Sequence, residues 1–533
     1  MRASGTKTSR PRQRFDKTAL LFTDTPLSVM PASTQETTSA DADQQADSQQ
    51  NSRPERCQPE HPDRFVTATS LFDGHDAAIN IMRRILQQTG AEVIHLGHNR
   101  SVQEIVDTAI EEDAQGIAVS SYQGGHMEYF TYMHALLEER GAGHIRVYGG
   151  GGGVIVPEEK RELEDYGIAH IYSPDEGMEM GLQGMINDMM EACDVPILEL
   201  GFRIGESASE RDSRVVARNL SAVEMGKTAQ IEMPAVAERA AEDREVRIGN
   251  RGGERESREA RGDGSPEGLN VQGLKVEGSG APTLGITGTG GAGKSTMTDE
   301  IVRHFLNDFE DLELAVLSID PTRRRTGGAL LGDRIRMNAI YGNDADRVYM
   351  RSFATRGANR TTTEALREAI AVCKAAGFDL IVVETAGIGQ SNTEIVDLAD
   401  LSLYVMTHDF GAQTQLEKIG MLDLADFVAI NKYEKRGSED ALRDVRKQVQ
   451  RNRVRFDEDP EDMPVYPTMA AHFGDPGVTR LFKALLERLN EAYDFDRETQ
   501  TYAGEVPEPD PAEVSIIPPD RERYLGEIVE TCE

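Results

Sequence analysis

The sequence lacks the features that would direct it into a membrane or an oxidising compartment. No apolar run approaches the ~18 residues of a membrane-spanning helix, and Ala19–Phe22 is far too short for a signal-peptide core. The four cysteines lie far apart, without metal-ligand spacing, which indicates a reducing, cytoplasmic setting. Basic residues are scarce too: 58 Lys and Arg against 92 Asp and Glu give a net charge of −34. We therefore expect neither nucleic acid nor a membrane as a partner.

Composition and the order of apolar segments divide the 533 residues into five regions. The 38% hydrophobic content is enough for several cores, and the length corresponds to about three or four domains. Two regions alternate short apolar runs with helical periodicity, whereas the others are rich in polar, charged or proline residues. The predicted regions are a disordered segment (1–62), a first domain (63–204), a charged linker (205–280), a second domain (281–492) and a C-terminal linker (493–533).

The first domain is predicted to be α/β, with the doubly wound topology of flavodoxin. Strands that alternate with helices indicate a parallel sheet, and five such units fit this topology. The predicted strands are Phe65–Phe72, Glu92–Gly97, Gly116–Ser121, Ile145–Gly150 and Ala169–Ser173. The predicted helices are Ile79–Thr89, Val102–Glu112, Glu128–Arg140, Glu158–Tyr166 and Gly177–Ala192.

The second domain shows the same alternation and begins with a phosphate-binding loop. Gly288–Ser295 matches G-x-x-x-x-G-K-[ST] without a mismatch, between a short strand and a predicted helix. In such a loop the backbone N–H groups cradle phosphate, Lys294 reaches the β/γ-phosphates and the Ser295 hydroxyl holds Mg²⁺. A chance glycine-rich connector is disfavoured because strand, loop and helix stand in order. The residues predicted to bind nucleotide here are Gly288, Gly290, Gly291, Ala292, Gly293, Lys294 and Ser295. The predicted strands of this domain are Leu284–Thr287, Leu314–Ile319, Asp379–Glu384, Leu401–Met406 and Phe427–Asn431.

Carboxylates at two further strand ends suit a magnesium site. Asp320 ends one predicted strand and Glu384 ends another, and a carboxylate at such a point reaches Mg²⁺ directly or through water. Together with Lys294 they are the predicted catalytic residues. The basic stretch Arg323–Gly328 is either a switch segment or a solvated loop, and the sequence leaves both open.

A third loop of this domain is expected to read the base of the nucleotide. Asn431, Lys432 and Glu434 resemble the guanine-reading N-K-x-D loop, in which an acidic side chain accepts from guanine N1 and N2. Glu434 stands where Asp is usual, so the choice between GTP and ATP stays open at this position. The alternative is an exposed strand-end loop, where Asn and Lys are common.

The chemistry-bearing residues of the first domain gather after three of its predicted strands. His75 follows the first strand, Ser120 ends the third, and the glycine run Gly149–Gly153 ends the fourth. Because ligands bind beyond the carboxyl ends of parallel strands, these residues share one edge. His75 is suited to ligate a metal, and Asp73 is placed to accept its other ring N–H. The alternative is a turn that caps the following helix.

This pattern resembles the cobalamin-binding domain of adenosylcobalamin-dependent acyl-CoA mutases, with D-x-H-x-x-G, S-x-L and G-G. The resemblance implies that His75 is the lower axial cobalt ligand and that Asp73 is its hydrogen-bonded partner. It also implies that the dimethylbenzimidazole tail is lined by Ser120, Gly150, Gly151 and Gly152. Ala78 and Tyr122 depart from the pattern, but neither departure removes the cobalt ligand.

The second domain resembles the metallochaperone GTPases that serve methylmalonyl-CoA mutase. The shared stretches are Gly285–Gly288, Ser318–Pro321, Gly327–Asp333 and Glu384–Gln390. By this resemblance, Arg336 contacts the nucleotide and 413–420 is a further switch. The residues that it places around Mg²⁺ are Ser295, Asp320, Asp333, Glu384 and Thr385.

The two domains in one chain resemble the fused isobutyryl-CoA mutases, which continue into a mutase barrel. Too few residues follow Asn490 for the roughly 250 that such a barrel needs, so a truncated product or a split system is expected. The implied function is adenosylcobalamin binding coupled to Mg²⁺-dependent GTP hydrolysis, for loading an acyl-CoA mutase domain or subunit. A homodimer and an adenosyltransferase donor are the other expected partners. A corrinoid module for methyl transfer and a nucleotide-gated scaffold without cobalamin remain alternatives.

Overall fold

The structure is a computed structural model. The residues that it describes are 55–199, 212–227, 270–271, 274–275, 281–320, 326–342, 344–354, 362–385, 394–410, 416–493, 495, 497–499 and 504–509. They all lie in the second of two compact units, Met1–Ser52 and Arg53–Glu533. Most of the predicted disordered segment, linker and C-terminal region falls outside the described residues, as do 323–325, 386–390 and 413–415.

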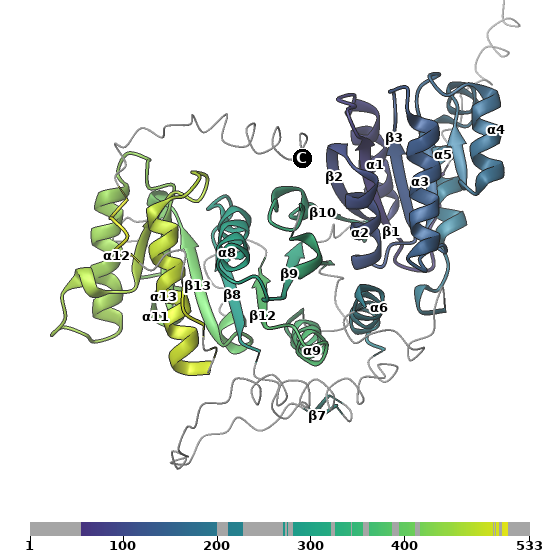
Figure 1. Ribbon diagram of the computed structural model, residues 1–533. Coiled ribbons are helices and arrows are strands. Elements are labelled where there is room, and N and C mark those ends of the chain that lie inside the picture. The colour runs from purple at the N-terminus through teal and green to yellow at the C-terminus, as the bar shows by residue number, and fades with distance from the viewer. Residues whose placement is uncertain are drawn as a thin grey trace, which may run out of the picture. The chain divides into compact units, whose positions relative to one another are not determined.

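The first domain is built on a six-stranded parallel sheet with the order β10-β2-β1-β3-β4-β5 (Figure 1). Its strands are β1 (Arg64–Ser70), β2 (Glu92–Arg100), β3 (Gly116–Ser120), β4 (Arg146–Gly150), β5 (His170–Tyr172) and β10 (Ala329–Leu331). The order of β1 to β5 is that of flavodoxin, which confirms the predicted fold class. The sixth strand was not predicted, and it comes from the sequence of the second domain.

Helices cover both faces of this sheet, so its central strands β1 and β3 are buried along their whole length. They are α1 (Ala77–Thr89), α2 (Val102–Glu111), α3 (His126–Glu139), α4 (Pro157–Tyr166) and α5 (Pro174–Cys193). Leu86 of α1 and Ile186 of α5 pack on one face with Phe65, and α2, α3 and α4 cover the other. Ser101 and Ser173 begin α2 and α5 with capping boxes, which fix where these helices start.

The second domain is built on a seven-stranded parallel sheet with the order β11-β9-β12-β8-β13-β14-β15. Its strands are β8 (Thr283–Gly288), β9 (Leu314–Asp320), β11 (Val348–Ala354), β12 (Leu380–Glu384), β13 (Leu401–Met406), β14 (Phe427–Asn431) and β15 (Val465–Thr468). Its helices are α8 (Lys294–Asp308), α9 (Thr362–Ala375), α11 (Met421–Leu424), α12 (Ser438–Asn452) and α13 (Pro476–Tyr493). The strands β6 (Asn270–Val271) and β7 (Leu274–Lys275) form a separate pair. The five predicted strands are present, and β11 and β15 were missed.

Helix α6 (Ser213–Glu224) corrects the prediction of a linker over this stretch. Leu220 and Val223 pack in the core of the second domain, and α6 contacts both α9 and α2. Two of its charged side chains, those of Arg218 and Glu224, are buried and paired: Arg218 pairs with Asp113 at 3.0 Å, and Glu224 accepts from Arg64. A stretch rich in charged residues therefore forms part of the packed structure.

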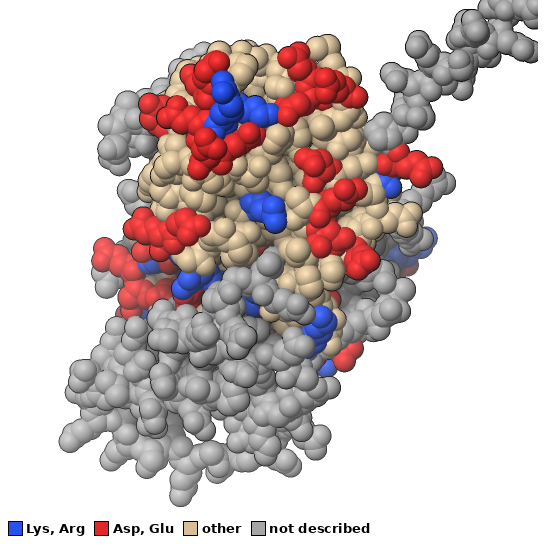
Figure 2. Space-filling model, turned by 90° about the vertical axis from the view of Figure 1, so that its right-hand side faces the viewer, with Lys and Arg blue, Asp and Glu red and all other residues tan. Residues whose placement is uncertain are grey.

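Figure 2 shows acidic side chains spread over one face, with few basic ones among them. Among the described residues, no helix is both long and apolar enough to cross a membrane.

Candidate functional site

The first candidate site lies where the strand order of the first sheet reverses, between β1 and β3. Asp73 and His75 follow β1, and Ser120 and Tyr122 stand at the end of β3, so the topology brings them together. The Asp73 carboxylate accepts hydrogen bonds from the backbone N–H of His75 at 2.9 Å and of Tyr122 at 2.5 Å. It thereby ties the two loops to each other.

The geometry of His75 leaves one ring nitrogen free. Its Nδ1 lies 2.8 Å from Asp73 Oδ1, and its side chain is 71% exposed, whereas that of Asp73 is fully buried. Burial raises the pKa of Asp73, but the hydrogen bonds from Tyr122 and His75 outweigh it and lower that pKa overall. An ionised Asp73 only accepts, so Nδ1 carries the proton and Nε2 offers its lone pair outward. This is the arrangement of a metal-ligating histidine with a carboxylate behind it.

The remaining residues predicted for this site lie beside His75. Ser120 is buried and pairs with Gly150 across β3 and β4. The centre of the Tyr122 ring lies 5.5 Å from that of the His75 ring, and a side chain on Gly152 would collide with the Tyr122 ring. Gly152 also has a φ of 55°, so both conformation and space require glycine there. Gly149, by contrast, packs against Phe130 in the core, which gives that glycine a structural role.

Apolar side chains surround this edge of the sheet. Phe72 is 67% exposed in the loop before His75, and Met178 is 77% exposed near the start of α5. Others that remain at the surface are Leu71, Ile81, Val154, Val156, Met180 and Leu182. Such exposed apolar groups are typical of a surface that binds a ligand or a partner.

The second candidate site is the phosphate-binding loop between β8 and α8. Gly293 has a φ of 91°, and a side chain there would collide with the Asn431 amide. The Lys294 ammonium is buried and donates to the Thr289 carbonyl at 3.3 Å, and burial lowers its pKa. The loop thus presents backbone N–H groups and one buried cation at the start of α8, which suits a phosphate.

Three carboxylates from different elements meet beside this loop. Ser295 donates to Glu384 at 2.7 Å and to Asp333 at 3.3 Å, and Asp320 accepts from the Gly332 N–H at 3.0 Å. Burial and the charge of Asp333 raise the pKa values of both Asp320 and Glu384. The site therefore has more negative charge than its neighbours neutralise.

This donor set fits Mg²⁺ held together with a nucleotide. Hydroxyl and carboxylate oxygens are the ligands that Mg²⁺ takes, and crowded carboxylates with raised pKa values favour a cation. Within the described residues, no group of three or more His, Cys, Asp or Glu side chains is arranged so that it could hold a metal ion by itself. Phosphate and water would therefore supply much of the coordination, as is usual for Mg²⁺ with nucleotides.

The other predicted residues of this site take up different positions. The Asn431 amide joins two loops, because its Nδ2 donates to the Ala292 carbonyl at 2.8 Å and its Oδ1 accepts from the Ala470 N–H. Lys432 donates to the Gly291 carbonyl. Glu434 is exposed beside them. Asn431 thus holds the phosphate loop in place whatever base is bound.

Two residues predicted beside Mg²⁺ or nucleotide have other neighbours in this structure. The Thr385 hydroxyl donates to that of Thr287 at 2.8 Å. Arg336 is exposed and donates to Asp333 at 3.1 Å. Both lie close to the carboxylates, and their roles remain predictions.

Two hydroxyl groups that hold the carboxylates were not predicted from the sequence. Thr298 donates to Glu384 at 2.9 Å, and Ser318 donates to Asp333 at 2.8 Å. The signal was present in the spacing, because Thr298 lies one helical turn after Ser295 on the same face of α8.

Comparison with known proteins assigns both domains. Residues 63–180 match the family described as B12 binding domain, and residues 258–501 match Methylmalonyl Co-A mutase-associated GTPase MeaB. The fused isobutyryl-CoA mutase of Geobacillus kaustophilus is 52% identical over 473 residues, covering 89% of this chain and 40% of that protein. That of Cupriavidus metallidurans is 51% identical over 473 residues, covering 88% and 39%. GTPase ArgK of Escherichia coli is 37% identical over 149 residues, covering 28% and 44%.

These matches show a chain homologous to the fused isobutyryl-CoA mutases, with a B12-binding domain and a MeaB-type GTPase domain. The chain spans about 40% of the length of those mutases.

Proposed function

We propose that this homologue of the fused isobutyryl-CoA mutases binds adenosylcobalamin through His75, hydrolyses GTP with Mg²⁺, and couples the two to load and protect an acyl-CoA mutase. The geometry of Asp73 and His75 carries the proposal, because a buried carboxylate orients an exposed imidazole toward a ligand. Bound cobalamin would supply the cobalt–carbon bond, whose cleavage starts radical chemistry.

The residues of the second domain support the nucleotide half of the proposal. Lys294 would neutralise phosphate charge, while Ser295 would hold Mg²⁺, with Asp320, Asp333 and Glu384 around it. Positioning and electrostatic stabilisation are the main contributions that a protein makes to phosphoryl transfer.

We infer a mutase domain or subunit as the partner, because the relatives that carry that name extend far beyond the part matched here. Carbon-skeleton isomerisation of an isobutyryl- or butyryl-type acyl-CoA would then take place only with that partner. A homodimer, delivery of the cofactor by an adenosyltransferase and a cytoplasmic location are proposed from the family resemblance.

Substitution of His75 tests the cobalamin half. In His75→Ala the bound cobalamin should lose its imidazole ligand, so its absorbance spectrum changes and its affinity falls at least tenfold. The exposed His98, at the end of β2, provides the control variant His98→Ala, which should bind like the wild type. An unchanged spectrum and affinity in His75→Ala would show that another group ligates cobalt or that no cobalamin binds.

Substitution of Lys294 tests the nucleotide half. Lys294→Ala should lower the rate of GTP hydrolysis by about 100-fold or more, because a preorganised cation facing the transferred phosphate is removed. The exposed Lys447 on α12 serves as control in Lys447→Ala, with an unchanged rate expected. Release of phosphate from GTP measures both variants, and full activity in Lys294→Ala would contradict the assignment.

A further inference from the structure

The segment from Thr326 to Arg336 connects the sheet of the first domain to the candidate magnesium site of the second domain. It follows β9, which ends at Asp320, and it contributes β10 to the sheet of the first domain. Ala329, Leu330 and Leu331 pair in parallel with Glu92, Val93 and Ile94 of β2. The segment then returns to the carboxylate cluster at Asp333.

Strand β10 is an integral part of the first domain. Ala329 and Leu331 are fully buried in the same core as Val66 and Ile94. Hydrogen bonds hold the start of the strand, because the Ala329 N–H donates to the Ala91 carbonyl at 3.2 Å and Thr326 Oγ1 donates to the Gln87 carbonyl at 3.2 Å. A side chain on Gly328 would collide with these two carbonyl groups, so the approach is close.

The end of β10 is attached to the candidate magnesium site. The residue after the strand, Gly332, donates its N–H to the Asp320 carboxylate at 3.0 Å. The next residue, Asp333, accepts from Ser295 of the phosphate loop and from Ser318 of β9. One residue, Gly332, therefore separates the core of the first domain, which ends at Leu331, from the carboxylate of Asp333 beside the phosphate loop.

Arg334 anchors the same segment from the other side. Its guanidinium is buried, donates to Glu111 of α2 and to the Met350 carbonyl at 2.8 Å, and lies 3.5 Å from the Glu112 carboxylate. Glu112 also accepts from Ser352 of β11 at 2.9 Å. A buried arginine with partners in both domains has little freedom to move, because breaking its contacts would leave buried charges unpaired.

We propose that the first domain positions Asp333 for Mg²⁺ through β10 and Arg334, so that the nucleotide site and the cobalamin-binding domain are coupled through residues 326–336. This inference rests on the proposed function and adds where the coupling is made. Arg334 is a positioning residue, since its guanidinium is buried against Glu111 and the Met350 carbonyl and would act through the neighbouring Asp333. Because coupling is reciprocal, Mg²⁺-nucleotide should in turn strengthen the pairing of β10 with β2.

The test compares two buried arginines of this interface in the full chain. Arg334→Met removes the anchor next to Asp333. Arg218→Met removes an equally buried arginine, which pairs with Asp113 and is not adjacent to Asp333 in the sequence. A fluorescent, non-hydrolysable GTP analogue is titrated with and without Mg²⁺. Arg334→Met should need about tenfold more Mg²⁺ for tight binding, within the usual range of coupling, and Arg218→Met should not. Cobalamin binding through His75 should be preserved in both.

Hydrogen exchange gives a second readout that activity does not influence. In the wild type, Mg²⁺ with the analogue should slow exchange at the amides of β10, and Arg334→Met should abolish this effect. The inference would be overturned if the Mg²⁺ requirement rose equally in the two variants or did not rise in Arg334→Met. It would also be overturned if the nucleotide left the exchange rates of β10 unchanged in the wild type. None of these results would affect the proposed function. Failure of the wild type to bind the analogue would overturn both.

Discussion

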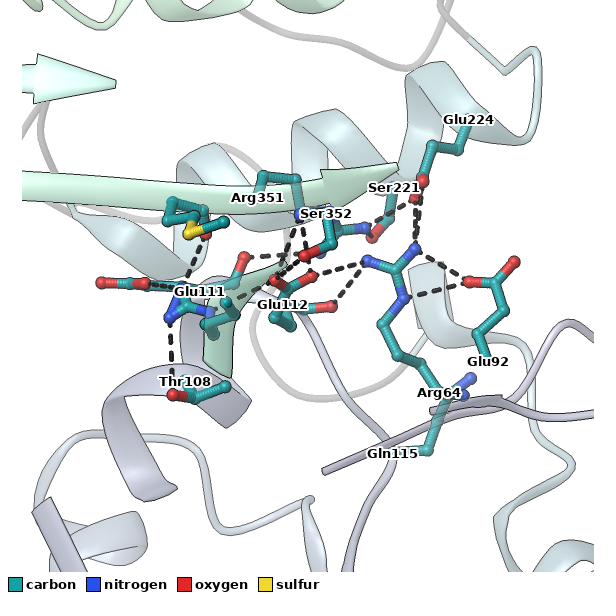
Figure 3. Close-up of polar contacts among 12 residues, drawn as sticks. Arg64, Glu92, Thr108, Glu111, Glu112, Gln115, Ser221, Glu224, Arg351 and Ser352 are labelled. Carbon is teal, nitrogen blue, oxygen red and sulfur yellow. Dashed lines mark hydrogen bonds and ion pairs between the residues drawn. The ribbon is translucent and has the colours of Figure 1, made fainter. Parts of the chain in front are cut away.

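Two buried clusters of charged residues in this chain differ in how well their charges are matched. Where the domains meet, Arg64 donates to Glu92, Glu112 and Glu224, and Arg351 donates to Glu224, so that the buried charges shown in Figure 3 have oppositely charged partners. At the phosphate loop, three carboxylates face hydroxyl groups, one exposed arginine and one buried lysine.

We interpret the matched cluster as structural and the unmatched cluster as a site for a cation. A matched buried cluster is complete, so its residues specify how the elements pack and need no further ligand. The carboxylates beside the phosphate loop outnumber the cations around them, so a bound Mg²⁺ would supply the missing positive charge. A raised carboxylate pKa does not by itself mark such a site, because Glu111 of the matched cluster has one as well.

The largest effect is expected from breaking the matched cluster. Arg64→Met should lower the free energy of unfolding by about 3–5 kcal/mol, because three buried carboxylates lose a shared partner. Urea denaturation measures the change. The exposed pair of Arg443 and Asp440 supplies the control, and Arg443→Met should stay within about 0.5 kcal/mol of the wild type. A loss below about 1 kcal/mol in Arg64→Met would mean that the cluster is not needed for folding.

The opposite sign is expected at the unmatched cluster. Without Mg²⁺, Glu384→Gln should raise the free energy of unfolding by about 1–2 kcal/mol, because it removes a buried charge that Asp333 repels. With Mg²⁺ and GDP the advantage should disappear, since the wild-type carboxylate then has a cation nearby. Thermal unfolding in the two conditions distinguishes these outcomes. Destabilisation by Glu384→Gln in the absence of metal would contradict the view that this cluster carries excess charge.

A pH-dependent effect is expected at one carboxylate of the matched cluster, Glu111. Burial raises the pKa of Glu111 to about 7, with Arg334 opposing the shift and Glu112 adding to it. The folded state then retains a proton that the unfolded state releases, so this group lowers stability as the pH rises from about 4.5 to 7. Glu111→Gln should remove that decline, roughly 2–3 kcal/mol for a pKa that moves from 4.5 to about 7. Urea denaturation at pH 5 and pH 8 measures it, and an unchanged pH dependence would argue that Glu111 is ionised throughout.

Local patterns predicted most of the two sheets and the positions of the candidate sites. The phosphate loop is contiguous in sequence, and the rule that ligands lie beyond the carboxyl ends of strands placed Asp73 beside Ser120 and Glu384 beside Ser295. Strand β10 was missed because it has three residues and pairs with a strand more than two hundred residues earlier. Its position depends on a tertiary contact that no local periodicity records.

Helix α6 was missed for a different reason. Charged residues are normally taken as exposed, and this rule made the segment look like a linker. Arg218 and Glu224 are buried because their partners, Asp113 and Arg64, come from the first domain. A sequence pattern does not reveal that two charged residues far apart in the chain neutralise each other.

The strand β10 also has a consequence for how this protein can be divided. Its pairing covers β2, which would otherwise form an open edge of the first sheet. An isolated first domain ending near residue 199 would expose the hydrogen-bonding groups of β2 and the apolar surface that Ala329 and Leu331 now bury. Open sheet edges of this kind promote self-association, so such a fragment should aggregate where the full chain does not. Recombination should therefore have to move the two domains between proteins together, although the sequence pattern predicts two separate domains.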